Sequence, residues 1–398
     1  MTAEAHGSTA ELLQLAHSVG DDYTIPGRWY TDPDFARIEE ERLFRHGWQF
    51  AGFTSQVAET GDYFTCRAWH IPVIVVRASP DALNAFANVC RHRGSLIVEE
   101  PANQYETASC HGNRRSLQCM YHGWTYGLDG SLRAAPGLAK ESGLDTEELG
   151  LWPVQVDTWG PLVFVNPDPN AGPLAETLAE LPGLVDALGI DLHGLLKPHG
   201  WRSYAFDSNW KISVDNFLEC YHCAINHPAL VEQLDMDRLW CDNSYDTFLW
   251  LGFKVKSSSI DVVGDAYAGV IWPNFAIGLF PGEGFAHTNL FVADGIERSI
   301  QYRAYCFAET VSDEIAEENM DFMDQVVSED QPLCARVQQG VRSGLFDQGY
   351  VMDKNNERSI GAFHRYLARE LAASEPAESP AQQPQAALAG AGPESSPA

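Results

Sequence analysis

Short runs of β-branched and aromatic residues recur along the chain between positions 48 and 165. Examples are "WQFAGF", "YFTCRAW", "IPVIVVRA", "LNAFANVC" and "GPLVFVNP", and Gly, Pro, Asp and Asn separate them. Apolar runs of this length, bounded by turn-forming residues, are typical of β-strands. We therefore predict an all-β domain over residues 48–165.

Helical patterns lie on both sides of this domain. In residues 32–48, "DPDFARIEEERLFRHGW", the apolar positions recur at near-helical spacing after an acidic start. Helical segments follow residue 172, strands such as "AYAGVIWPNFAIGLFP" come next, and a long amphipathic helix is expected over about 311–343. Residues 373–398 lack aromatic residues and are rich in Ala, Pro, Gln, Ser and Glu, which predicts a disordered tail.

The 398 residues carry a formal net charge of -29. This acidic excess argues against binding to nucleic acid and to anionic membranes, because both attract basic surfaces. No apolar run reaches the roughly 18 residues that span a bilayer, and the first residues lack the pattern of a secretory signal. Nine cysteines in such a chain favour reduced thiols, metal binding or catalysis. We therefore expect a cytoplasmic protein.

Two short motifs inside the β-rich stretch combine a cysteine with a histidine. "CRHRG" places Cys90 two positions before His92, and "CMYHGW" places Cys119 three positions before His122. Such a set suits tetrahedral zinc. It also suits a Rieske [2Fe–2S] cluster, in which two cysteines hold one iron and two histidines hold the other. Each motif mixes both ligand types, so two adjacent loops would present sulfurs on one side and nitrogens on the other, which favours the Rieske cluster.

A further cysteine–histidine pair, Cys110 and His111, lies between the two motifs. It has no Cys-x-x-His spacing, whereas Cys119 and His122 have it. We interpret "PANQYETASCHGNRRS", residues 101–116, as an inserted loop, and we expect its cysteine and histidine to take no part in the metal site.

The motif "NFLECYHCAINHP" contains a second candidate metal site, with His222 and His227. Five residues along a regular helix correspond to about 140° of rotation, so the two imidazoles would point apart. Pro228 disfavours helical geometry at the preceding residue, and a break there would let the imidazoles converge. Two histidines and one carboxylate form the facial triad of non-haem Fe(II) oxygenases.

Together these motifs resemble the catalytic α subunit of Rieske non-haem iron oxygenases, the aromatic-ring-hydroxylating dioxygenase family, over residues 30–370. "NWK", "LECYHC" and "EDQPLCARVQQGVRSG" are most similar to the branch that oxidises glycine betaine, choline and carnitine. The resemblance implies an α+β fold, with an all-β Rieske domain and a helix-grip catalytic domain in which helices cover an antiparallel sheet. It also implies that residues 1–47 belong with the catalytic domain of residues 166–372.

The resemblance implies the ligand sets as well. Cys90, His92, Cys119 and His122 would hold the [2Fe–2S] cluster. His222 and His227 would hold a mononuclear Fe(II), together with an aspartate from the long helix.

That aspartate has two candidates. Asp330 in "VSEDQPLCARVQ" matches the family's sequence motif better than Asp324 in "FMDQVV" does. Asp324 stays as the alternative. Glu219, three positions before His222, matches the carboxylate that bridges an iron-ligand histidine and a cluster-ligand histidine of the neighbouring subunit. A carboxylate at a ligand histidine fixes the tautomer and the ring orientation.

The family's chemistry sets the expected function. Electrons from NAD(P)H would pass through a separate reductase, with or without a ferredoxin, to the cluster of one subunit and then to the iron of the next, in a homotrimer. With O2, a small organic substrate would be hydroxylated, or a quaternary ammonium compound would be oxidatively N-demethylated. Hydroxylation or O-demethylation of an aromatic compound is the alternative. A Rieske electron carrier without oxygenase activity is the alternative of another class.

Four aromatic residues, Trp272, Phe275, Phe280 and Phe285, fall in the strands that line the cavity in this family. An aromatic cage would bind a quaternary ammonium group by cation–π attraction. The same side chains would equally suit the wall of an arene pocket.

Overall fold

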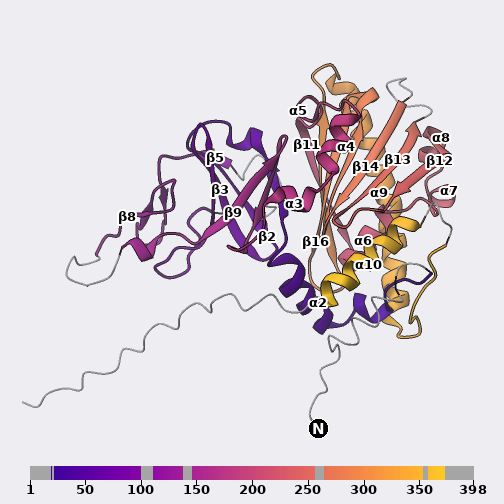
Figure 1. Cartoon of the computed structure of the whole chain (residues 1–398), viewed down its shortest axis with the longest axis horizontal. Helices are drawn as coiled ribbons and strands as arrows, with labels where there is room; N and C mark the ends of the chain where they lie inside the picture. Colours follow the sequence, from indigo (N-terminus) through magenta and orange to yellow (C-terminus); the bar gives the residue numbers. More distant parts are fainter. Residues whose placement is uncertain are drawn as a thin grey trace, which may run out of the picture.

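The computed structural model describes residues 19, 22–99, 111–137, 146–255, 264–352 and 357–372. The predicted tail lies outside these residues. A smaller β-domain lies beside a larger domain in which helices cover an antiparallel sheet (Figure 1). The α+β fold predicted from the sequence is confirmed.

The β-domain contains a seven-stranded sheet and a small three-stranded sheet. The strand orders are β1-β10-β9-β4-β3-β2-β5 and β6-β7-β8. The strands are β1 (Gln49–Phe53), β2 (Asp62–Ala68), β3 (Ile71–Ser79), β4 (Ala82–Ala87), β5 (His111–Asn113), β6 (Leu117–Gln118), β7 (Thr125–Tyr126), β8 (Leu132–Ala134), β9 (Pro153–Trp159) and β10 (Leu162–Asn166).

The continuous apolar run of β3 reflects burial on both faces of its sheet. Ile74 and Val76 pack into one hydrophobic cluster, and Val73 and Val75 pack into another on the opposite face. All four side chains are fully buried. Apolar residues at successive positions are therefore needed here, whereas a half-exposed strand would alternate.

The larger domain is built on a second seven-stranded antiparallel sheet, in the order β11-β17-β16-β15-β14-β13-β12. Its strands are β11 (Pro198–Phe206), β12 (Leu234–Asp242), β13 (Phe248–Val255), β14 (Gly264–Ile271), β15 (Phe275–Phe280), β16 (Phe285–Ala293) and β17 (Ser299–Phe307). Its helices include α6 (Trp210–Phe217), α7 (Cys223–Asn226), α8 (Pro228–Gln233), α9 (Asp313–Arg342) and α10 (Arg358–Ala372).

The two faces of this second sheet pack against different partners. One face forms a hydrophobic cluster with α6, α9 and α10. The other face packs against α3 (Leu174–Leu178), α4 (Leu181–Ala187), α5 (Leu192–Leu195) and the edge of the β-domain, where Phe50 stacks on Phe275 with ring centroids 4.3 Å apart. The β-domain thus packs on the same face of the sheet as α3, α4 and α5. The opposite face, which α6, α9 and α10 cover, is available for a site.

A buried ion pair positions the helix that leads into the second histidine motif. Lys211 Nζ lies 2.5 Å from Glu39 Oε1, and both side chains are almost fully buried. Trp210 Nε1 donates to the other oxygen of Glu39 at 3.0 Å, and Asn209 caps α6 by accepting from the Lys211 amide. Glu39 ends α2 (Pro33–Glu39). Residues 209–211, the "NWK" motif, therefore connect α6 to the N-terminal helix α2. Removing one charge of a buried ion pair typically costs about 3–5 kcal/mol of stability.

Among the described residues, no helix combines the length and the apolar character that crossing a bilayer requires.

Candidate metal centres and active-site pocket

The two cysteine–histidine motifs of the β-domain form loops of the same conformation. The amide of Gly94 donates to the Cys90 carbonyl at 2.9 Å, and the amide of Gly123 donates to the Cys119 carbonyl at 3.0 Å. Both glycines have left-handed φ values, 69° and 74°, which a residue with a side chain rarely adopts. Each glycine closes a tight turn that presents the histidine inside it.

The side chains of these loops gather as a Rieske cluster requires. Cys90 and Cys119 are buried free thiols, each 2% exposed. The His92 and His122 rings lie nearer the surface, with centroids 4.6 Å apart, and His92 stacks on Trp124. Inner sulfurs and outer imidazoles fit a cluster with one cysteine-held iron and one histidine-held iron.

The structure separates His111 from this group. His111 lies on the edge strand β5, where it pairs with Phe64 of β2, and Cys110 lies outside the described residues. His122 lies between β6 and β7, beside His92. The geometry therefore selects His122 as the partner of His92.

We expect His122→Ala to give a folded protein without the Rieske absorption spectrum, because it removes one of the two histidines predicted to hold the outer iron. His111→Ala serves as the matched control and should keep the spectrum. Visible absorption and iron analysis of both variants provide the measurement. A normal spectrum in His122→Ala with a lost spectrum in His111→Ala would show that the inserted loop supplies the ligand.

The two histidines of the second motif converge because the helix breaks between them. His222 precedes α7, and His227 lies between α7 and α8 with φ -125° and ψ 64°, outside the helical region. This is the break that Pro228 predicts. The two ring centroids are 5.2 Å apart.

Asp330, on α9, completes this group. Its Oδ1 lies 2.9 Å from His227 Nε2 and 3.3 Å from His222 Nε2, and Asn216 Nδ2 donates to the same oxygen at 3.1 Å. Burial acts to raise the pKa of Asp330, but hydrogen bonds from the two histidines lower it overall. The carboxylate is therefore ionised where the two imidazole nitrogens meet.

The alternative aspartate points elsewhere. Asp324 accepts hydrogen bonds from Tyr204 and Tyr305, the latter at 2.9 Å, and pairs with Arg202 at 3.3 Å. The structure therefore brings Asp330, and not Asp324, to the two histidines.

Each histidine of this second site has its own outer carboxylate. Glu219 Oε1 contacts His222 Nδ1, and Glu329 Oε2 lies 2.7 Å from His227 Nδ1. Burial acts to lower the pKa of His222, but Asp330 and Glu219 raise it to about 9. Glu219 is predicted from its position three residues before His222, whereas no local sequence signal indicates the contact of Glu329 with His227.

The donor set of this second site suits a divalent cation. Three carboxylates surround two imidazoles, so negative charge exceeds positive charge even when both rings are protonated. With Nδ1 of each ring held by an outer carboxylate, each Nε2 faces Asp330, as metal ligation requires. The residues present therefore fit a mononuclear iron held by two nitrogens and one carboxylate.

Cys223 lies close to both histidines, with the candidate ligand atoms within 4.8 Å of one another, but it is joined to Cys220 in a disulfide. The expectation of reduced thiols is thus wrong at this pair, because a tight turn places two cysteines three residues apart with Cα atoms 4.9 Å from each other. Six other described cysteines are free. A sulfur in a disulfide is no thiolate ligand, so Asp330 is the better candidate for the third ligand.

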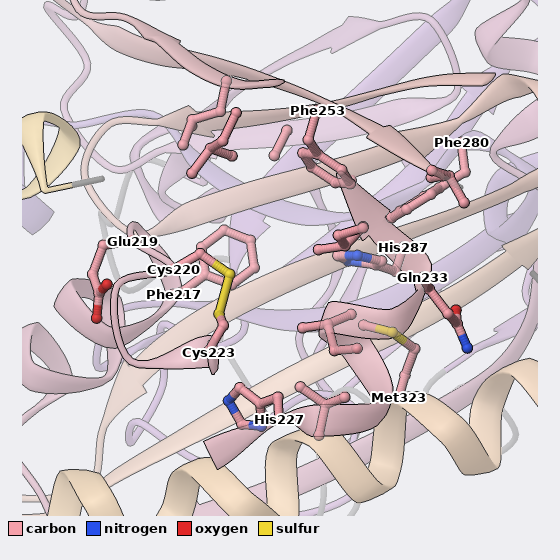
Figure 2. Close-up of a pocket in the computed structure, with 18 of the residues that line it drawn as sticks. Phe217, Glu219, Cys220, Cys223, His227, Gln233, Phe253, Phe280, His287 and Met323 are labelled. Carbon is pink, nitrogen blue, oxygen red and sulfur yellow. A yellow bond between two sulfur atoms is a disulfide. The ribbon is translucent and has the colours of Figure 1, made fainter. Parts of the chain in front are cut away.

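A pocket opens directly from this second site (Figure 2). His222, His227 and Asp330 line it. Its aromatic side chains come from α6, β12, β13, the β15–β16 hairpin and α9: Phe217, Trp240, Phe253, Phe280, Phe285 and Phe322.

Two of the four aromatic residues expected in this pocket do not line it. Phe280 and Phe285 do, but Phe275 packs against Phe50 on the other face of the sheet, and Trp272 packs against the α10 residues Phe363 and Tyr366. Side chains alternate along a strand, so Phe275 and Phe280, five positions apart on β15, face opposite sides.

Known families match both parts of the chain. The family model for the Rieske [2Fe-2S] domain matches residues 47–157, and that for the catalytic domain of the ring hydroxylating alpha subunit matches residues 193–260 and 260–373. A chloroplastic choline monooxygenase of Beta vulgaris is 33% identical over 368 residues, which cover 88% of this chain and 78% of the relative. The chain belongs to the Rieske oxygenases.

Other relatives of this Rieske oxygenase include the oxygenase subunit of carnitine monooxygenase from Escherichia coli (strain K12). It is 29% identical over 359 residues, covering 87% of this chain and 93% of the relative. A crystal structure of a quaternary ammonium Rieske monooxygenase superposes with a TM-score of 0.81 at 25% identity, over 90% of this chain and 98% of the other. Naphthalene 1,2-dioxygenase from Rhodococcus sp. shares the fold, with a TM-score of 0.74 at 20% identity, over 92% and 99% of the two chains.

Membership of the Rieske oxygenases confirms the predicted class of fold and of activity. The protein is an oxidoreductase with a Rieske domain and a ring-hydroxylating type of catalytic domain. These domains imply a [2Fe–2S] cluster, a mononuclear iron and electrons supplied by a reductase. The domain boundaries of residues 48–165 and 166–372 stay predictions.

Proposed function

We propose that this Rieske oxygenase hydroxylates an N-methyl group of a quaternary ammonium compound, with O2 and electrons from a separate NAD(P)H-dependent reductase. One observation carries the proposal: His222, His227 and Asp330 converge at a pocket that is lined by many aromatic side chains. The names of the relatives support the same class of substrate, since they are choline and carnitine monooxygenases.

We assign Cys90, His92, Cys119 and His122 to the [2Fe–2S] cluster. His222, His227 and Asp330 are assigned to the mononuclear iron. When bound, the cluster supplies single electrons and the iron activates O2 for hydroxylation of a C–H bond.

The chain's own residues prepare this site for the reaction. Glu219 and Glu329 hold the Nδ1 atoms of the two ligand histidines and so direct each Nε2 inward. Phe253, Phe280 and Phe285 exclude water and offer ring faces to a trimethylammonium group, which cation–π attraction favours.

The overall reaction balances as an oxidative demethylation. One N-methyl group of the quaternary ammonium ion, O2, two electrons and two protons give an N-hydroxymethyl group and water. The hydroxymethyl product then loses formaldehyde and a proton to leave a tertiary amine. Formaldehyde is therefore the diagnostic product.

We further propose that the protein works as a homotrimer. Within one chain, the small sheet that carries the His122 loop and helix α7 beside the second site lie at opposite ends of the molecule (Figure 1). Both ends expose apolar side chains: Met120 and Tyr121 in the cluster loop, Tyr221 and Ile225 beside the second site. A head-to-tail ring would bring one chain's cluster loop to the next chain's second site and cover these side chains.

We place the protein in the cytoplasm as part of the same proposal, supported by the six free cysteines among the described residues.

The deciding experiment supplies the purified protein with NADH and a surrogate Rieske-oxygenase reductase. O2 uptake and formaldehyde release would be followed with trimethylammonium compounds and, separately, with aromatic acids and methoxyarenes. We expect formaldehyde only with the trimethylammonium compounds. Turnover of the aromatic set alone would replace this proposal by aromatic hydroxylation or O-demethylation. A reducible cluster without any mononuclear iron would indicate an electron carrier.

A further inference from the structure

A chain of buried polar side chains runs under the active-site pocket, on β16 and β17. Gln301 Nε2 and Arg303 Nε donate to Asn289 Oδ1 at 2.8 and 2.6 Å. A guanidinium can only donate, so the amide of Asn289 must turn its oxygen toward Arg303. Its nitrogen must then face the other way, where it lies 2.9 Å from His287 Nδ1.

This network fixes the proton of His287. Because the Asn289 nitrogen donates, His287 Nδ1 must accept, and the ring proton is on Nε2. Burial, followed by the charge of Arg303, lowers the pKa of His287 well below its usual value. The ring is therefore neutral, with one N–H donor at Nε2.

That donor faces the pocket. His287 lines it and pairs in register with Gly278 of β15. A Cβ at residue 278 would lie 2.4 Å from Nε2, so the glycine leaves the room that this atom occupies at the pocket wall. Among the described residues Nε2 has no hydrogen-bond partner. Figure 2 shows the imidazole near Phe253, Phe280 and Met323, across the pocket from the disulfide.

The wall behind His287 is positively charged. Arg303 is 3% exposed and lines the same pocket. Its ring contacts are with Tyr204 and Tyr305, and no carboxylate of the described residues lies within 4.0 Å of its nitrogens. Arg303 is linked to Asp324 indirectly: it donates to the Tyr305 hydroxyl at 3.5 Å, and this hydroxyl donates to Asp324 at 2.9 Å. A buried cation without an adjacent carboxylate is costly, and an anionic ligand group nearby would offset that cost.

We propose that the Nε2–H of His287 binds a carboxylate of the substrate, and that the pocket therefore takes a zwitterion with an N-methylated ammonium group and a carboxylate. This rests on the proposed function and narrows its substrate class. The ring faces of Phe253, Phe280 and Phe285 in the same pocket suit the ammonium group, while His287 and Arg303 suit the carboxylate. A zwitterion matches both.

The test compares ligands that share a trimethylammonium group. Glycine betaine and γ-butyrobetaine carry a carboxylate, and choline carries a hydroxyl group. Dissociation constants would be measured by calorimetry on the iron-loaded protein and on His287→Phe, which keeps a ring but removes the donor. A hydrogen bond to a charged group corresponds to about 10- to 100-fold in affinity. We expect the better carboxylate ligand to weaken by that factor in His287→Phe, choline to change less than about twofold, and His287→Gln to restore part of the binding.

Gly278→Ala provides a second variant that keeps the His287 side chain but obstructs its Nε2, because the added Cβ would lie 2.4 Å from that atom and displace the ring. It should produce the same selective loss, including when His287→Phe fails to fold. Equal weakening of choline and the carboxylates, or no change in either, would overturn the inference. Formaldehyde from choline but from neither carboxylate would also overturn it while leaving the proposed function intact. Formaldehyde from no trimethylammonium compound would overturn both.

Discussion

Asp330→Ala is expected to keep the Rieske absorption spectrum and to lose measurable turnover. The carboxylate oxygen of Asp330 lies where the two imidazoles meet, 2.9 Å from His227 Nε2 and 3.3 Å from His222 Nε2. Removing it leaves two nitrogen donors, which do not make a facial triad. Iron analysis should show the cluster iron retained and the mononuclear iron lost. His227→Ala should behave in the same way, because it removes another of the three proposed ligands.

The matched control is Asp324→Asn, six positions earlier on the same helix. Asp324 contacts Tyr204, Tyr305 and Arg202 and not the histidines. Its variant should therefore keep the mononuclear iron and turnover and lose only stability, by about 1–2 kcal/mol for weakened, partly buried hydrogen bonds. Thermal unfolding, iron content and O2 uptake distinguish the two outcomes. Full activity in Asp330→Ala with none in Asp324→Asn would transfer the ligand role to Asp324.

The choice between these two aspartates shows what the sequence could and could not predict. Both lie on α9, and six residues along a helix correspond to about 240° of rotation, so they point in different directions. Which direction meets the histidines depends on how α9 packs over the sheet. The sequence around Asp330 resembles the family motif and so favours this aspartate. Only the packing of α9, however, brings its carboxylate oxygen to His227.

The proximity of candidate ligands that are close in sequence is the most predictable feature of the two sites. Cys90 with His92, and Cys119 with His122, belong to tight turns whose glycines can be read directly from the motifs. The convergence of His222 and His227 follows from one proline.

Residues that act from a distance were not predictable in this way. Glu329 contacts His227 across 102 residues of chain, and nothing local to either residue indicates the pairing. The pocket residues Trp240 and Phe253 depend on strand register, as does the exclusion of Phe275. The tautomer of His287 depends on Asn289, two positions along β16, and on Arg303, which strand pairing brings beside Asn289.

The final prediction concerns Glu219, whose position suits electron delivery between chains. Its Oε1 contacts His222 Nδ1, its Oε2 accepts from the Tyr221 amide, and the neighbouring Tyr221 side chain is 55% exposed. The carboxylate therefore joins a proposed iron ligand to the surface that a head-to-tail ring would cover. In the proposed trimer, the cluster histidine of the next chain would meet this surface.

Glu219→Gln keeps the shape of the side chain and an oxygen for His222, but it removes the charge and one acceptor. Replacing such an outer carboxylate typically costs about 10- to 100-fold in affinity or activity. We expect both metals to be present, substrate to bind normally, and the reduced cluster to reoxidise more slowly by that factor. Rapid mixing of the reduced variant with substrate and O2, followed by the cluster's visible absorption, measures this rate.

Glu329→Gln is the matched control, because Glu329 makes the equivalent contact to the other ligand histidine, at 2.7 Å from His227 Nδ1. It alters the iron environment without touching the surface beside Tyr221, so its cluster should reoxidise faster than that of Glu219→Gln. Equal slowing in both variants would assign the effect to histidine basicity and not to a path between chains. Reoxidation at the wild-type rate in Glu219→Gln would leave Glu219 with a purely local role at His222.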